Sequence, residues 1–168
     1  MHNAVGYRLA VVVGAASLLL PAAGCGGHGA APTAEAGPPT CPATFAEQQS
    51  QPANRAGDLV PAGATQALLC VYPFPRQDAA AGYRLDRSVS AVGSPEGVVR
   101  YLNGLSSPDS GTAGSCTLMG HDQYQIVLGY AGGTRTVVRI DYNCGTASAH
   151  GAVRRVDRMD TLLAFWPR

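Results

Sequence analysis

The sequence contains no lysine, because all twelve of its basic residues are arginine. A P-loop needs a lysine for its phosphates, a protein kinase needs one on its third strand, and Schiff-base enzymes need one to bond a carbonyl carbon. These classes of enzyme are therefore excluded.

Charge is also scarce, since charged residues make up only 14% of the chain. Beyond Arg8, eleven arginines face eleven aspartates and glutamates, and no stretch is strongly basic. A protein that follows a phosphate backbone needs a basic surface. We therefore expect no nucleic-acid partner.

Long apolar runs are absent after the N-terminal region. The run from Leu9 to Ala23 is shorter than the ~20 residues that cross a bilayer comfortably, and nothing later approaches that length. The sequence thus excludes a polytopic membrane protein.

The N-terminal region has the three parts of a secretory signal. A weakly positive segment spans residues 1–8, an apolar segment spans 9–20, and small residues occupy 22–24. We expect residues 1–24 to be a signal peptide and the rest of the chain to be exported.

The end of this signal resembles the lipobox of bacterial lipoproteins. It reads Leu20-Pro21-Ala22-Ala23-Gly24-Cys25, with Ala22 where that family most often has leucine. The resemblance implies that Cys25 is lipidated and becomes the N-terminus, which anchors the protein on the outer side of the cell membrane. Two or more acyl chains anchor stably. The alternative is ordinary secretion with Cys25 as a free thiol.

The cysteine count agrees with the lipid anchor. Of five cysteines, lipidation of Cys25 leaves an even set of four, which in an exported protein indicates two disulfides. Three connectivities are possible. We favour Cys41–Cys70 with Cys116–Cys144, because each closes a local loop of similar length. A zinc site is the alternative, but no cysteine pair has the close spacing of zinc-binding motifs.

Composition divides the exported chain into two parts. Residues 25–40 combine the lipidated cysteine with a tether of glycine, alanine, proline and threonine, which offers no large side chain to bury. Residues 41–168 have the length of one domain.

The clearest pattern within this domain is a β-hairpin. The segments 124–131 and 135–142 alternate between apolar and polar residues around a glycine pair. Their apolar sets share a face only across a loop of odd length. We predict the three-residue loop 132–134, with Leu128 opposite Val138 and with the other face, including Gln125, Arg135, Arg139 and Asp141, toward solvent.

Two segments have helical patterns. Ser94-Pro95-Glu96 is typical of a helix start, and apolar residues follow at helical spacing. Val156, Met159, Leu163 and Trp166 form a second helical pattern that stops before Pro167. With strands expected over 67–72 and 83–92, we predict an α+β fold in which one or two helices cover a small antiparallel sheet held by two disulfides.

No convincing catalytic constellation is present. No G-x-S-x-G elbow occurs, and the spacing of His121, Asp122, Asp141 and His150 matches no metal-binding motif. Pro-aromatic runs such as 72–75 usually pack onto their own domain, and we interpret Arg154, Arg155 and Arg158 as a solvated helix face. We expect no catalytic residue, no metal and no cofactor.

The stretch from Tyr101 to Gly151 also resembles the bacterial subtilisin-inhibitor family. The landmarks are Leu102-Asn103-Gly104-Leu105, Cys116-Thr117-Leu118-Met119, Tyr142-Asn143-Cys144 and Ala149-His150-Gly151. The resemblance implies a disulfide-braced loop that enters a protease cleft, with Leu118 as the specificity residue and Met119 after the resistant bond. The chain departs from the family where Gly120-His121-Asp122 replaces a proline-containing stretch.

The leading interpretation is a membrane-anchored extracytoplasmic lipoprotein whose domain binds an envelope protein or polymer without catalysis. A subtilisin-type protease inhibitor is the alternative.

Overall fold

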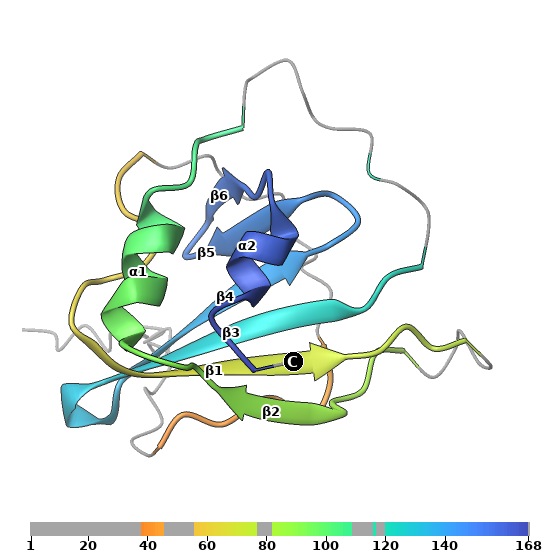
Figure 1. Cartoon of the computed structure of the whole chain (residues 1–168), viewed down its shortest axis with the longest axis horizontal. Coiled ribbons are helices and arrows are strands. Elements are labelled where there is room, and N and C mark those ends of the chain that lie inside the picture. Colours follow the sequence, from red (N-terminus) through yellow and green to blue (C-terminus); the bar gives the residue numbers. More distant parts are fainter. Residues whose placement is uncertain (1–37, 46–55, 77–81, 109–115, 117–119, 168) are drawn as a thin grey trace, which may run out of the picture. The chain divides into compact units, whose positions relative to one another are not determined.

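The computed structural model describes residues 38–45, 56–76, 82–108, 116 and 120–167, all within the compact unit formed by residues 33–168. Six strands form one antiparallel sheet in the order β2-β1-β3-β4-β5-β6 (Figure 1). The elements are β1 (Ala64–Tyr72), β2 (Arg87–Ser90), α1 (Pro95–Asn103), β3 (Gln123–Tyr130), the short 3₁₀ helix η2 (Ala131–Gly133), β4 (Arg135–Asp141), β5 (Thr146–Ala149), β6 (Ala152–Arg155) and α2 (Met159–Leu163).

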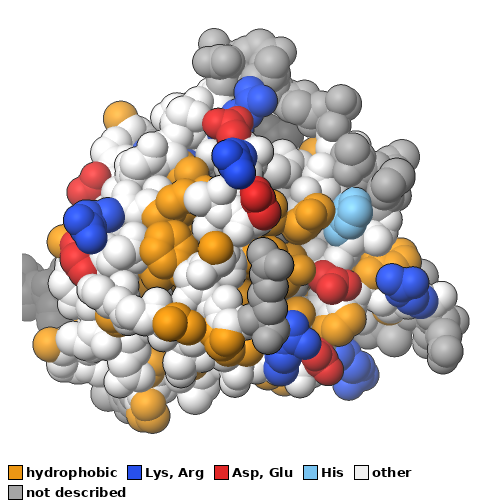
Figure 2. Space-filling view, viewed as in Figure 1, with side chains coloured by type: hydrophobic (Ala, Val, Ile, Leu, Met, Phe, Trp, Pro, Cys, Tyr) orange, Lys and Arg blue, Asp and Glu red, His pale blue; other side chains and the backbone are white. Residues whose placement is uncertain are grey.

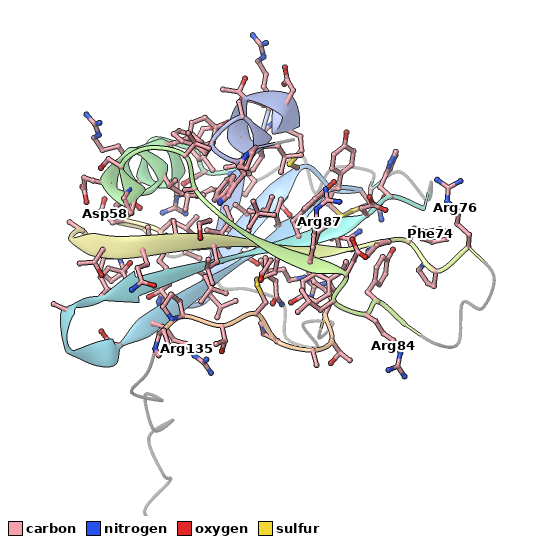
Figure 3. The ribbon with its side chains drawn as sticks, turned by 60° about the horizontal axis from the view of Figure 1, so that its bottom comes forward. Asp58, Phe74, Arg76, Arg84, Arg87 and Arg135 are labelled. Carbon is pink, nitrogen blue, oxygen red and sulfur yellow. A yellow bond between two sulfur atoms is a disulfide. The ribbon has the colours of Figure 1, made fainter. Side chains whose placement is uncertain are left out.

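The two α-helices lie on one face of the sheet, and residues 38–45, which we call the N-terminal strap, cross the other face (Figure 3). The fold is therefore α+β with a small helical share. The hairpin of β5 and β6, in which Ala147 pairs with Arg154, was not predicted from the sequence.

The helix side of the sheet holds the main hydrophobic core. Ser94 caps α1 as predicted, because its Oγ accepts a hydrogen bond from the Glu96 amide at 3.2 Å and Pro95 opens the helix. The helix then buries Val98, Val99 and Leu102. They join side chains that alternate along the strands, among them Leu69, Val71, Ile126, Leu128, Val138 and Ile140.

The β3–β4 hairpin exists, but its loop begins one residue earlier than predicted. The loop is Ala131–Gly133, so Leu128 pairs with Thr136 and the predicted pairing with Val138 is wrong. Both glycines have positive φ, +83° at Gly132 and +79° at Gly133. The loop keeps its odd length, and the apolar sets therefore share a face as expected.

The opposite face of this hairpin is not solvated, which corrects the expectation for Gln125 and Arg139. Gln125 is buried under the strap, and the Arg139 guanidinium lies 4.2 Å from the centre of the Phe45 ring. The sequence could not reveal this, because the covering residue comes from a segment about ninety positions away in the chain.

Several contacts hold the strap on the sheet. Thr44 forms an antiparallel bridge with Arg84, and the Cys41–Cys70 disulfide joins the strap to β1. Phe45 packs with Tyr72, whose hydroxyl lies 2.9 Å from the Pro42 carbonyl oxygen and 3.0 Å from Gln125 Oε1. Burial of this hydroxyl raises the pKa of Tyr72 to about 12.

The second helix is shorter than its sequence pattern. It spans Met159–Leu163, and Val156 precedes it after β6. Arg154 is not on a solvated helix face, because it is a buried residue of β6 whose guanidinium donates to the carbonyls of Val153 and Gly57. Strand pairing with β5 outweighs the helical spacing here.

The structure contains the two disulfides Cys41–Cys70 and Cys116–Cys144, which is the pairing favoured from the sequence. Their sequence separations are 29 and 28 residues.

Candidate functional site

A groove of about 390 Å³ opens on the helix side of the sheet, between the strands and the C-terminal segment. Figure 2 views this side and shows apolar side chains between charged ones around α2. The lining comes from five parts of the fold: Leu69 and Val71 of β1, Arg87 of β2, Tyr124 of β3, Tyr142 after β4, and Asp160, Leu163, Ala164, Trp166 and Pro167 of the C-terminal segment.

Apolar groups dominate the inner part of the groove. Leu69 and Val71 are buried because alternate residues of β1 point to the helix side. Leu163 and Pro167 face them from the C-terminal segment. Pockets of a few hundred Å³ with mostly apolar linings and few polar groups are typical of small-molecule binding sites.

Trp166 adds a polar group to this apolar lining. It is 3% exposed, and its buried Nε1–H has no hydrogen-bond acceptor among the described residues. A buried indole N–H usually has a partner. Trp166 is also the only tryptophan of the chain.

Two tyrosines form the aromatic part of the lining. The rings of Tyr124 and Tyr142 lie 6.3 Å apart, and His121 stacks on Tyr142 at 4.7 Å. Burial raises the pKa of Tyr124, with a smaller contribution from the charge of Asp122. The Tyr124 hydroxyl therefore remains protonated at neutral pH.

Two opposite charges stand at the rim. Asp160 pairs with Arg158 at 3.3 Å, and the hydrogen bond from that guanidinium lowers the pKa of the Asp160 carboxyl. Arg87 lies 3.8 Å from Asp86, and both side chains are more than half exposed. An exposed pair at this distance is weak. Both pairs at the rim are therefore exposed, and the Arg87–Asp86 pair has the longer separation.

The residues singled out for lipidation and protease inhibition lie outside the described part of the chain. These are Cys25, Leu118 and Met119. Two residues that flank Leu118 and Met119 are described. Cys116 forms a disulfide with Cys144, and Gly120 lies so close to the Phe74 ring that an added Cβ would clash with it.

The residues after Gly120 are also held in place. The Tyr83 hydroxyl donates to the His121 carbonyl at 3.3 Å, and Asp122 Oδ1 accepts from the Phe74 amide at 3.0 Å. Phe74 is thus packed against its own domain, as the sequence indicated for this Pro-aromatic run.

The candidate metal ligands have separate local contacts. Asp122 binds the Phe74 amide, Asp141 accepts from the Cys144 amide at 3.1 Å, and His150 Nε2 lies 3.4 Å from Thr136 Oγ1. Within the described ranges, no group of three or more histidine, cysteine or acidic side chains is placed to hold a metal ion.

The groove residues were not identified as a site from the sequence. Trp166 and Leu163 were noted only as a helical pattern, and Arg87 carried no signal. No local sequence signal marks the groove, because its lining comes from segments that are far apart in the chain.

Comparisons with protein-family models, curated proteins and solved structures found no match to this chain. In the part of the chain that the structure describes, no helix has both the length and the apolar character to cross a bilayer.

Proposed function

We propose that the protein is a non-catalytic binding module of the bacterial cell envelope, held on the outer side of the membrane by a lipid on Cys25. The observation that carries the binding role is the groove beside α2, with its apolar interior and its buried, unpaired indole N–H. The signal-like N-terminus and the lipobox resemblance support the anchor.

The disulfides are consistent with this location, because such bonds persist in oxidising compartments outside the cytoplasm. The tether of residues 26–40 has a mean end-to-end distance of roughly 20 Å, which lets the domain stand clear of lipid headgroups. A binding domain in that position meets small molecules, polymers and proteins of the envelope.

The anchor is tested by the intact mass of the protein from its native membrane fraction. We expect a chain that begins at Cys25, carries acyl chains, and has four cysteines that react with an alkylating agent only after reduction. Cys25→Ala should release the protein from the membrane. An unlipidated mass would show that the protein is secreted and would overturn the anchor.

The binding role is tested by native mass spectrometry of the gently purified protein. We expect a non-covalently bound molecule that is lost in Ala164→Phe, because Ala164 is exposed at the groove and a phenyl ring would fill it. Ala131→Phe, at the exposed β3–β4 loop, is the matched control. A native protein without bound molecules in the presence of envelope extract would contradict the binding role.

As a second candidate, we propose that residues 116–120 inhibit a subtilisin-type protease. The specific observation is that both flanks of Leu118 and Met119 are braced, by the Cys116–Cys144 disulfide and by Phe74 against Gly120. Preorganisation of a loop lowers the entropy lost on binding.

Titration of subtilisin with the full chain and a chromogenic substrate tests this candidate. Inhibition should be lost in Leu118→Asp and kept in Val92→Asp, which changes an apolar residue that is 66% exposed elsewhere. Unchanged turnover at excess protein would remove the candidate.

A further inference from the structure

We propose that the groove beside α2 binds a small amphiphile with one anionic headgroup, which contacts Arg87 while its apolar body lies along Leu69, Val71 and Leu163. This inference rests on the proposed binding role of the groove and specifies the chemistry of its ligand. It depends on two features of the lining: the charges at the rim and the apolar interior.

The charge balance of the rim favours an anion. Asp160 forms an exposed pair with Arg158 at 3.3 Å, with side-chain exposures of 68% and 74%, so a cationic ligand would have to compete with a guanidinium for it. Arg87 has a long contact to Asp86 at 3.8 Å, with side-chain exposures of 62% and 52%. A carboxylate can approach Arg87 without breaking a strong pair.

Arg87 favours a ligand with hydrogen-bond acceptors. Its guanidinium offers only donors. A carboxylate oxygen can accept from it, whereas an ammonium group, which has no acceptor, cannot.

The interior requires an apolar body on the same ligand. Leu69 is 6% exposed and Val71 is 4% exposed, and the half-buried Leu163 faces them. A short alkyl chain removes this surface from water, which is favourable in proportion to the area covered. The volume of about 390 Å³ suits one small molecule rather than a folded partner.

Decanoate is the probe for this inference, with decanol, decyltrimethylammonium and acetate as comparison ligands. The full chain carries Cys25→Ser, which prevents acylation, and is exported so that both disulfides form. Binding is followed without detergent and below micelle formation by calorimetry and by the fluorescence of Trp166, the only tryptophan. We expect saturable binding of decanoate, weaker binding of decanol, and none of acetate or the cation.

Two variants separate the headgroup from the apolar body. Arg87→Gln should weaken decanoate about fivefold, the scale of an exposed ion pair, and leave decanol unchanged. Ala164→Phe should abolish binding of both. Arg84→Gln is the matched control, because Arg84 is an exposed arginine on the far side of the sheet from the helices (Figure 3).

The outcomes distinguish this inference from the proposed function. Equal binding of decanoate and decanol, or no effect of Arg87→Gln, overturns the anionic headgroup while the groove remains a binding site. No binding of either decyl ligand, with a groove-dependent molecule still found by native mass spectrometry, overturns the amphiphile alone. Absence of both results overturns the inference and the binding role together.

Discussion

The two faces of the sheet are covered in different ways. On the helix side, α1 and α2 pack aliphatic side chains into a broad core and leave a groove beside α2. On the strap side, the buried cluster is small and consists of Phe45, Cys70, Tyr72 and Val127. One face is thus held chiefly by apolar packing, and the other by a covalent link with aromatic and polar contacts.

This difference separates the contacts that close the strap side of the fold from the groove that we propose as a binding site. The strap side uses a disulfide, a backbone bridge and a tyrosine hydroxyl to close a narrow apolar area. The helix side has the larger apolar cluster, and some of its apolar residues line the groove. Variants that act on one face and not on the other can therefore test the comparison.

The largest effect is expected when the strap is released. Replacing Cys41 and Cys70 together by alanine should lower the free energy of unfolding by about 3 to 5 kcal/mol. The equivalent change at Cys116 and Cys144 should cost less, although the loops have nearly equal separations of 29 and 28 residues, because Cys70 is fully buried and Cys116 is exposed.

Urea unfolding of the two alanine pairs provides this measurement. Since closure entropy is nearly the same for both loops, a difference between the pairs reports the packing around each disulfide. Equal losses would show that the strap adds nothing beyond loop closure.

A second comparison uses two neighbours on β3 that point to opposite faces. Ile126→Ala in the helix-side core should cost about 3 kcal/mol. Val127→Ala under the strap should cost about 2 kcal/mol, because one carbon fewer is removed and the strap can move into the space. Both side chains are fully buried, so exposure does not bias the comparison. Chemical denaturation of both variants measures it, and a larger loss for Val127→Ala would reverse our ranking of the faces.

The third prediction concerns the polar contacts under the strap. Tyr72→Phe should cost about 1 to 2 kcal/mol at neutral pH, because it removes the hydroxyl near Pro42 and Gln125. Decanoate binding on the other face should not change. Thermal unfolding and calorimetry measure the two effects.

The same tyrosine predicts a pH dependence. Its pKa is raised from 10.0 to about 12 in the fold, so its contribution to stability is fully present below pH 10 and is lost as the pH rises through 12, where the unfolded chain is already ionised. Between these pH values the wild type should lose more stability than Tyr72→Phe. Parallel pH slopes of the two proteins would contradict the assignment.

The smallest effect is expected at the N-cap of α1. Ser94→Ala removes the acceptor of the Glu96 amide and should cost about 1 kcal/mol. Ser94→Asp is the control, because aspartate is an equally good cap. Equal loss in both variants would mean that the cap contributes little to the helix side.

Local signals explain which parts of the fold could be predicted. The Ser94-Pro95-Glu96 cap acts within one turn, and the alternation of β3 and β4 fixes their shared face. The β5–β6 hairpin was missed because its strands are four residues each and its turn uses His150 at φ +48° before Gly151, without a usual two-residue turn signal.

The strap and the groove depend on contacts between distant segments. Phe45 is an isolated aromatic residue in the sequence, and contacts with distant residues, such as the Cys41–Cys70 disulfide and the bridge from Thr44 to Arg84, place it over Tyr72. Arg87 and Trp166, about eighty positions apart in the chain, line the same groove. The apolar periodicity of the segments that carry Arg87 and Trp166 does not indicate that both residues line one groove.

The strap also determines how a pull on the N-terminus reaches the domain. Tension passing through Cys41 enters β1 at Cys70 through a covalent bond, and β1 lies between β2 and β3 in the sheet. The disulfide bypasses the polypeptide between the two cysteines. A single cut within that segment would therefore leave β1 covalently connected to the residues before Cys41. A load applied to the N-terminal side of Cys41 is therefore carried into an inner strand of the sheet.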